Sequence, residues 1–153
     1  MALVRMAYSD VEAIMTMAGC SQHLFWMAAG VLQGDPLSGS IFVLVMDPFL
    51  RLLRRHVELP GWGVVRACAD DVGASLSSVV ALVHCFPAFD LIERAAGLAL
   101  KPRKCKVVPL CPWSDILVLR IREWLQERVP PWQGFGVVPK AVYLGFQMGP
   151  SSD

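Results

Sequence analysis

The chain has 153 residues, of which 55% are hydrophobic and 18% charged, and its net charge at pH 7 is +1. This length suits one domain with one core, the composition is apolar for a domain that faces water on every side, and the charge excludes a uniformly basic protein. The five cysteines are scattered without a Cys-x-x-Cys pair, so neither a disulfide framework nor a zinc site is indicated.

No apolar run reaches the roughly 18 residues of a membrane-spanning helix, and the first residues lack the pattern of a secretory signal. We therefore expect a soluble protein with no membrane partner. Its expected location is intracellular, with the nucleus as one candidate compartment, and it is not expected to be secreted.

The first predicted region, residues 1–29, is a helical segment of uncertain role. Apolar residues at helical spacing predict a short helix from Asp10 to about Gly19, where glycine would end it. Turn residues follow, and Pro36 is placed to open the next helix because its missing N–H has no intrahelical partner there.

The next helix is predicted to run from Leu37 along a stripe of apolar residues. Pro48 should kink or divide this helix, because proline removes a backbone hydrogen bond and its ring clashes with the preceding turn. Asp47 would then cap a second piece that continues through Arg55.

A hairpin is predicted after this helix. The first strand runs over residues 64–69 and the second over residues 72–76, with Asp70 and Asp71 at the tip. Aspartate tolerates the backbone conformations of a tight turn, so two aspartates are sterically acceptable there.

The rest of the chain alternates predicted helices and strands. Ser78 precedes a helix that ends at Gly97 and is interrupted near Pro87, and a strand covers residues 105–110. Ser114 caps a helix through about Arg128, and two last strands, residues 135–138 and 142–148, are predicted to form a terminal hairpin. This order predicts an α+β fold, with helices packed on one face of a largely antiparallel sheet.

The chemistry is concentrated at the predicted hairpin tip. Adjacent carboxylates at roughly 4 Å repel each other by about 1 kcal/mol in water and by several times that near a protein surface. A divalent cation offsets this repulsion, and Mg²⁺ favours one or two carboxylates together with substrate phosphates. The alternative is a solvated turn with no ligand, which is the commoner situation for an Asp-Asp pair without further context.

Two clusters of basic residues are dense enough to meet phosphates, although solvated faces of a helix end and a loop are the commoner explanation for such clusters taken alone. The clusters are Arg51, Arg54, Arg55 and His56, and Lys101, Arg103, Lys104 and Lys106.

Four motifs in order carry a resemblance to a known family. They are GVLQGDPLSGS at 30–40, ACADD at 67–71, GLALKPRKC at 97–105 and VYLGF at 142–146. Together they resemble reverse transcriptases, especially those of non-LTR retrotransposons, with group II intron enzymes as relatives. The resemblance implies a polymerase palm fragment over residues 30–149, followed by a tail at 150–153.

The resemblance implies a role for each matching residue. Asp70 and Asp71 would hold catalytic Mg²⁺, with Mn²⁺ as a substitute, and Lys104 would lie near the nucleotide phosphates as a proton donor. The remaining matches would bind template, primer or nucleotide: Gln33, Gly34, Ser38, Tyr143, Leu144 and Gly145. Without the resemblance, these positions are an ordinary glycine turn, a solvated lysine and a buried strand with a glycine bulge.

The implied function is RNA-directed DNA polymerisation, in which a primer 3′-hydroxyl attacks a deoxynucleotide. The partners would be an RNA template, a DNA primer and deoxynucleotides. The chain departs from the family at Cys68, where an aromatic residue is usual, and at Gly39, where proline is common. We also expect the first palm strand with its aspartate, the fingers and the thumb to be missing, so that the chain alone is inactive.

Two alternatives from other classes are a non-catalytic nucleic-acid-binding module and an inactive relic of a truncated element. A different metal-dependent phosphohydrolase would use the aspartate pair, but it would have no need for the other motifs.

Overall fold

The structure is a computed structural model that describes residues 11–26 and 36–150. The chain divides into two compact units, Met1–Met46 and Asp47–Asp153, and each is described by itself. Helix α2 (Ser38–Val57) begins in the first unit and ends in the second.

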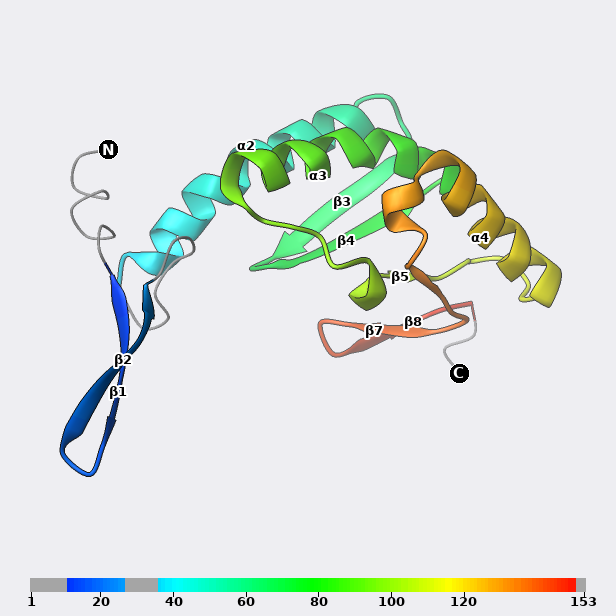
Figure 1. Cartoon of the computed structure of the whole chain (residues 1–153). Coiled ribbons are helices and arrows are strands. Elements are labelled where there is room, and N and C mark those ends of the chain that lie inside the picture. The colour runs from blue at the N-terminus through cyan, green and yellow to red at the C-terminus, as the bar shows by residue number, and fades with distance from the viewer. Residues whose placement is uncertain (1–10, 27–35, 151–153) are drawn as a thin grey trace. The chain divides into compact units, whose positions relative to one another are not determined.

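The first unit contains a hairpin in place of the predicted helix. Strands β1 (Glu12–Met17) and β2 (Cys20–Trp26) pair antiparallel through a two-residue turn (Figure 1). Ala18 and Gly19 both have positive φ, 51° and 80°, which is the backbone of a tight hairpin turn. The helix prediction over 10–19 is wrong because Ala18 and Gly19 reverse the chain, and because the β-branched Ile14 and Thr16 suit a strand.

Helix α2 runs unbroken through Pro48, so the predicted second helical piece capped by Asp47 is not formed. The Asp47 side chain instead makes an ion pair with Arg51 one turn later, at 2.8 Å. In the second unit, one stripe of the helix buries Phe49, Leu53 and Val57. Burial of each such side chain contributes about 1.5–3 kcal/mol, which together exceeds the roughly 3 kcal/mol cost of an internal proline.

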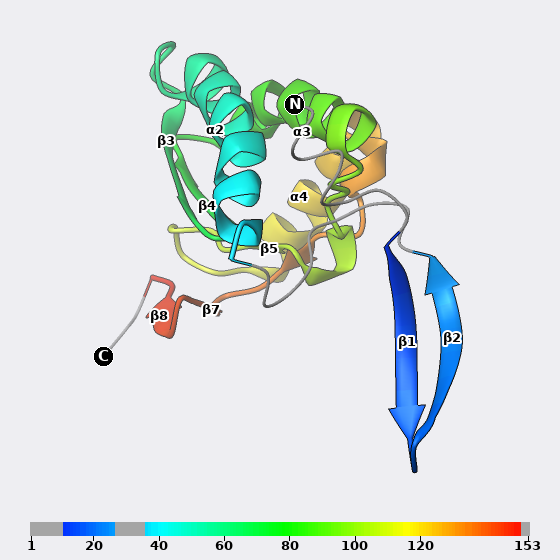
Figure 2. The same ribbon diagram turned by 90° about the vertical axis from the view of Figure 1, so that its left-hand side faces the viewer.

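The second unit contains the predicted hairpin with Asp70 and Asp71 at its tip, so this prediction is confirmed. Strands β3 (Gly63–Cys68) and β4 (Asp71–Leu76) pair antiparallel with Cys68 opposite Asp71. Because side chains alternate along a strand, one face of the hairpin carries Val65 and the other carries Asp71 and Gly73. Val65 is buried, and Figures 1 and 2 show α3 and the second half of α2 on one side of this hairpin.

Helix α3 (Leu82–Ala96) follows a short 3₁₀ turn, η1 (Val79–Ala81), whose cap is Ser78. The helix continues through Pro87, so the predicted interruption is absent, while the predicted end at Gly97 is confirmed by its left-handed φ of 69°. Burial of Cys85, Ala88 and Ile92 on the helix holds this segment against the core.

Aromatic rings join the helices of the second unit. Phe89 on α3 packs edge-on against Phe49 on α2, with ring centroids 5.0 Å apart. It also meets Trp132 of the 3₁₀ turn η3 (Pro130–Trp132) at 5.5 Å. Trp132 in turn stacks on Phe135, so one aromatic cluster ties α2, α3 and η3 together.

Helix α4 (Asp115–Arg128) begins where predicted, because the Ser114 hydroxyl accepts a hydrogen bond from the Leu117 N–H at 3.2 Å. It buries Ile121 and Leu125, whereas Ile116 in its first turn is 67% exposed. Helix α4 ends at Arg128, and Pro130 then opens the 3₁₀ turn η3.

The terminal strands pair differently from the prediction. Strand β5 (Lys106–Val107) is shorter than residues 105–110 and pairs in parallel with β6 (Gly136–Val137). The predicted last strand, residues 142–148, is itself folded into a hairpin. Its two strands are β7 (Ala141–Tyr143) and β8 (Phe146–Met148). Leu144 and Gly145, with φ of 50° and 84°, supply the tight turn that the sequence prediction had placed earlier.

The described residues thus form a mixed α and β fold with three α-helices and four separate two-stranded sheets. Helices lie on one face of the β3–β4 pair, but the continuous antiparallel sheet that we predicted is not present over residues 11–26 and 36–150. No helix in those ranges is both long and apolar enough to span a bilayer.

Candidate functional site

The two aspartates occupy different positions at the tip of the β3–β4 hairpin. Ala69 and Asp70 form the turn, and Asp71 is the first residue of β4. The positive φ of the turn, 51°, falls on Ala69, so the expectation that an aspartate takes the strained conformation does not hold. An alanine in this region costs roughly 1–2 kcal/mol, and the strain lies directly before Asp70.

Both carboxylates are exposed to solvent. None of the ion pairs within the described part of the chain involves either of them. Both carboxylates are therefore open to a cation, since no Lys, Arg or His of the described residues is paired with them.

The donor set suits one hard divalent cation. The described segments contain no group of three or more His, Cys, Asp or Glu that could enclose a metal ion. Two adjacent exposed carboxylates match the way Mg²⁺ binds, with one or two protein carboxylates and several waters or phosphate oxygens. Asp70 and Asp71 thus fit a single, open cation site.

A second motif lies against the hairpin that carries the aspartates. A Cβ atom placed on Gly73 of β4 would lie 2.9 Å from Cζ of the Tyr143 ring and 3.2 Å from each Cε. Gly73 is two residues beyond Asp71 and therefore on the same face of β4. The structure thus brings Tyr143 of the β7–β8 hairpin to the face from which Asp71 projects.

The three residues Tyr143, Leu144 and Gly145 form the end of β7 and the turn of its hairpin. The alternative interpretation, a buried strand with a glycine bulge, is wrong because Gly145 is a turn residue. The Tyr143 hydroxyl is buried and makes no hydrogen bond to any described residue. Packing against the backbone, and not a polar contact, therefore holds this ring.

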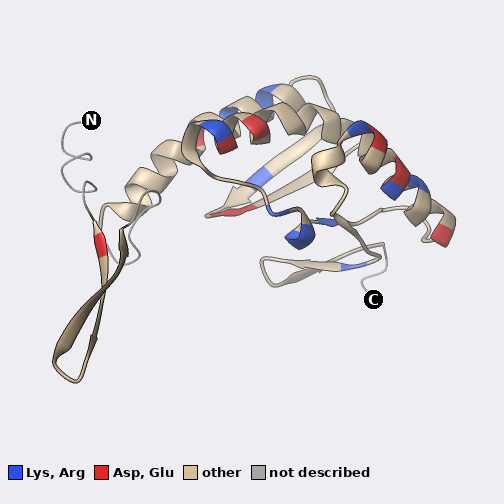
Figure 3. Cartoon of the chain, viewed as in Figure 1, with Lys and Arg blue, Asp and Glu red and all other residues tan. Residues whose placement is uncertain are grey.

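Lys104 ends the 3₁₀ turn η2 (Pro102–Lys104) and is exposed. This turn packs against Gly134, where an added Cβ would lie 3.3 Å from the Pro102 Cβ. Similarly, a Cβ on Gly136 would lie 2.8 Å from the Nζ atom of Lys106. Figure 3 shows Lys and Arg gathered at η2 and β5 and acidic residues at the tip of β3–β4.

The first basic cluster predicted from the sequence lies at the end of α2, which places Arg54, Arg55 and His56 in its last turn. Positive side chains at a helix C-terminus interact favourably with the exposed carbonyl groups there. This location supports the solvated helix-end interpretation for these residues.

The predicted residues of the first motif are not brought into one site by the described structure. Gln33 and Gly34 lie outside the described residues, and Ser38 is the first residue of α2, buried within the first unit. Ser38 and the aspartates belong to different units.

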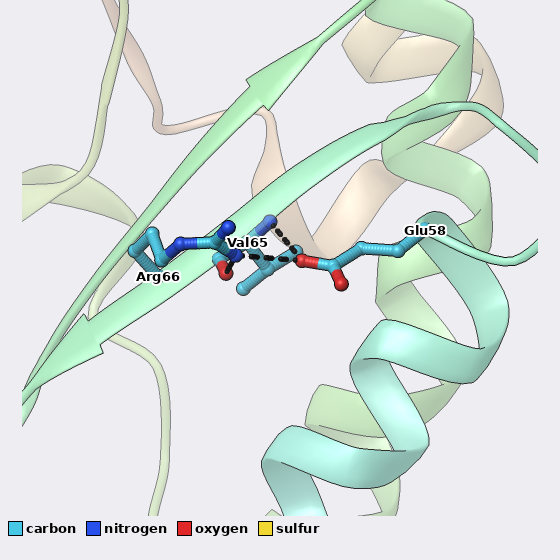
Figure 4. Close-up of polar contacts among 3 residues, drawn as sticks. All are labelled: Glu58, Val65 and Arg66. Carbon is cyan, nitrogen blue, oxygen red and sulfur yellow. Dashed lines mark hydrogen bonds and ion pairs between the residues drawn. The ribbon is translucent and has the colours of Figure 1, made fainter.

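Glu58 anchors the hairpin and was missed by the sequence analysis. Its Oε1 atom accepts a hydrogen bond from the Val65 N–H at 2.8 Å and another from Arg66 at 3.0 Å (Figure 4). The bond from Val65 lowers the pKa of the Glu58 carboxyl, and the nearby Arg66 and Arg54 charges lower this pKa further. This role is visible only in the hydrogen bond from Val65, seven residues further on. In the sequence, a single Glu before Leu59-Pro60 matches no pattern that would mark it.

Two cysteine thiols are unsuited to nucleophilic chemistry. Burial raises the pKa of Cys85 to about 11. Burial also raises the pKa of Cys105, whose Sγ lies 3.4 Å from the Lys101 carbonyl oxygen. A thiolate is the reactive form, so neither residue competes with the carboxylates as the candidate site.

Sequence comparison gives this geometry a context. The chain is similar to part of a retrotransposon polyprotein. The relative is the retrovirus-related Pol polyprotein from type-1 retrotransposable element R2 of Bradysia coprophila, 33% identical over 108 residues. The match covers 69% of this chain and 12% of the relative, so the chain spans a small part of the relative's length. No family model and no solved structure matches the chain.

Proposed function

We propose that this chain is a palm fragment of a reverse transcriptase, acting on an RNA template, a DNA primer and deoxynucleotides. The observation that carries the proposal is that the ring of Tyr143, the residue directly before the Leu144-Gly145 turn, lies against the face of β4 from which Asp71 projects. Both motifs belong to the same resemblance and lie about 70 residues apart in the sequence, and the similarity to a Pol polyprotein supports the same assignment.

Asp70 and Asp71 are the proposed ligands of Mg²⁺, for which Mn²⁺ can substitute. When bound, such cations stabilise the charge on the attacking and leaving oxygens of a phosphoryl transfer. The contribution of the chain is to hold both carboxylates on a short, hydrogen-bonded turn, so that little reorganisation is needed when substrate arrives.

The other motif residues complete the proposal. Lys104 would neutralise or protonate the leaving pyrophosphate, and the turn at Leu144 and Gly145 would contact the primer end. Gln33, Gly34 and Ser38 are proposed to face the template base and the nucleotide. An intracellular location, including the nucleus, is part of the proposal because the template and the nucleotides are found there.

The isolated chain is proposed to lack polymerase activity. The described residues offer two carboxylates from one hairpin and no third ligand grouped with them. One cation can be held in this way, but a clamp of two cations needs further donors.

The test separates cation binding from catalysis. Mn²⁺ binding to the purified chain, followed by water-proton relaxation, is expected to weaken about 10-fold or more in Asp70→Asn and Asp71→Asn, since each removes one of two charged ligands. The control is Asp90→Asn, because Asp90 is an exposed carboxylate already paired with Arg94 at 2.6 Å. Equal Mn²⁺ affinity in the original chain and in all three variants would contradict the proposed site.

Primer extension then tests the reaction itself. With an RNA template, Mg²⁺ and deoxynucleotides, we expect no extension by the chain alone, whereas robust extension that Asp70→Asn abolishes would overturn the inactivity claim. Fluorescence anisotropy of a labelled primer–template duplex should show binding that weakens steeply with salt.

A non-catalytic nucleic-acid-binding module is the second candidate. It is favoured by one observation: no acidic residue lies between Glu93 and Asp115, a stretch that contains the cluster around Lys104. Duplex binding that is unaffected by Mn²⁺ and by Asp70→Asn, with no cation site, would support this candidate over the first.

A further inference from the structure

We propose that Gly73 is a positioning residue that fixes the Tyr143-Leu144-Gly145 turn relative to Asp71, so that a primer end held by the turn is aligned with the carboxylates. The alignment of a primer rests on the proposed function, but the coupling of the two hairpins does not. Gly73 belongs to none of the four motifs that carry the family resemblance.

The first argument is the closeness of the contact. The position of a Cβ on Gly73 lies 2.9 Å from Cζ of Tyr143 and is equally distant, at 3.2 Å, from Cε1 and Cε2. The Cβ atom would therefore meet the hydroxyl-bearing end of the ring nearly symmetrically. Ordinary Cβ contacts are 3.4 Å or longer, so only a glycine lets the ring rest on the backbone of β4.

The second argument is that nothing polar replaces this contact. The Tyr143 hydroxyl is buried without a partner among the described residues. A tyrosine ring has only two side-chain torsions, so a displaced ring must move its own strand or leave the contact. A displacement at Gly73 therefore either shifts β7 and the turn that follows it or breaks the contact that positions them.

The third argument is the position of the contact along both hairpins. Gly73 is the next residue after Asp71 on the same face of β4, and Tyr143 directly precedes Leu144. The contact thus joins the two hairpins within two residues of each functional tip. A glycine deeper in the fold would couple the hairpins without defining the relative position of the tips.

A double-mutant cycle tests the coupling without any nucleic acid. Gly73→Ala should lower the equilibrium constant for folding about 10-fold in urea unfolding, although alanine is otherwise better than glycine in a strand. In the Tyr143→Ala background the same substitution should change the constant less than about 2-fold, because the ring is gone. Ala74→Gly, on the opposite face of β4, is the control, because it measures how much a Cβ atom changes the equilibrium constant for folding at a position of this strand away from the ring.

A Gly73→Ala protein that fails to fold would still allow a decision. The double variant Gly73→Ala with Tyr143→Ala removes the clash and is expected to fold as well as Tyr143→Ala alone. Equal effects of Gly73→Ala in the two backgrounds, or a double variant that also fails to fold where Tyr143→Ala folds, would overturn the coupling.

A spectroscopic signal distinguishes positioning from mere stability. With 2-aminopurine at the primer 3′ end, binding of the original chain should change the fluorescence, and Ala74→Gly should preserve this change because residue 74 lies on the face of β4 opposite to the Tyr143 ring. Gly73→Ala, at a temperature where it is folded, should bind the duplex within about 2-fold yet lose the change, because phosphate contacts far from β4 supply most of the affinity.

The outcomes separate the two proposals. Coupling in the cycle without any duplex binding would refute the proposed function and the primer alignment while leaving the contact between the hairpins established. Coupling and duplex binding with an unaltered fluorescence change in Gly73→Ala would refute the positioning role alone.

Discussion

Two hairpins of the chain share a local design and differ in what surrounds them. In both β1–β2 and β3–β4 a two-residue turn begins with an alanine whose φ is 51°, Ala18 in the first and Ala69 in the second. Every residue of β1 and β2 except Ala13 is exposed, and Ile14 is 52% exposed. By contrast, Val65 in β3 is 1% exposed.

The difference shows that turn geometry does not decide where a rigid site can be built. An isolated two-stranded hairpin is marginal in water, because few contacts offset the entropy lost on ordering it. The β3–β4 hairpin has three further supports: the burial of Val65, the Glu58 bond to its outer edge and the Tyr143 ring on its second face. The candidate site lies on the supported hairpin.

The largest expected effect comes from the core contact of the supported hairpin. Val65→Ala should lower the free energy of unfolding by about 2 kcal/mol, because it removes two buried methyl groups and leaves a cavity. The matched change Ile14→Ala in the exposed hairpin should stay within about 0.5 kcal/mol. Urea unfolding measures both, and similar effects at the two positions would contradict the difference in support.

The second expected effect concerns the other face of β4. Tyr143→Phe should raise the free energy of unfolding by about 1 kcal/mol, because burying a hydroxyl without a hydrogen bond costs roughly 1–3 kcal/mol. Thermal unfolding of the two proteins at one pH makes the comparison. A loss of stability on substitution would mean that the hydroxyl has a partner in solution.

The third prediction concerns the Glu58 anchor and pH. A carboxyl whose pKa is lowered on folding stabilises the protein at pH above its unfolded pKa, near 4.5, and this stabilisation is lost as the pH falls through the lowered folded value. Glu58→Gln keeps an acceptor for the Val65 N–H but removes the charge. The original chain should therefore be the more stable at pH 7, and the difference should disappear in acid.

Glu127→Gln, on an exposed position of α4, is the control for the loss of one negative charge. Unfolding curves between pH 3 and 7 for the three proteins give the comparison, and a Glu58→Gln difference that grew as the pH fell would show that the sign is wrong.

The smallest expected effect is at the turns. Ala69→Gly should raise the free energy of unfolding by up to about 1 kcal/mol, because it relieves the strain of a left-handed alanine. The gain is smaller than the strain itself, because glycine loses more conformational entropy on folding than alanine does. Ala18→Gly relieves the same strain in the first unit. In a Trp26→Phe background, where the four remaining tryptophans lie in the second unit, Ala18→Gly should leave the unfolding followed by tryptophan fluorescence unchanged. A shift would contradict the expectation that this turn affects only its own hairpin.

Local rules predicted the elements whose signals lie within a few residues. Ser114 at a helix start, Gly97 at a helix end and Asp70 at a hairpin tip all match the structure. The failures at Pro48 and Pro87 have one cause. The local cost of a proline is smaller than the burial of the apolar stripe around it, and that burial cannot be read without the fold.

The candidate site was predicted in part. The motif residues Asp70, Asp71 and Tyr143 were singled out from the sequence, whereas Glu58 and Gly73 were not. Each role depends on a contact with another element of the fold: Val65, seven residues on in β3, for Glu58, and Tyr143 in β7 for Gly73. A residue whose importance lies in one such contact has no local pattern to mark it.

The sequence by itself determined the aspartate hairpin, the helix start at Ser114, the helix end at Gly97 and the order of the four motifs, because turns, caps and alternation depend on neighbours in the chain. Only the tertiary structure decided which hairpin is supported, that residues 142–148 turn at Leu144, and that Tyr143 lies on Gly73. These depend on the fit between surfaces distant in sequence, where one Cβ atom decides whether a ring can approach a strand.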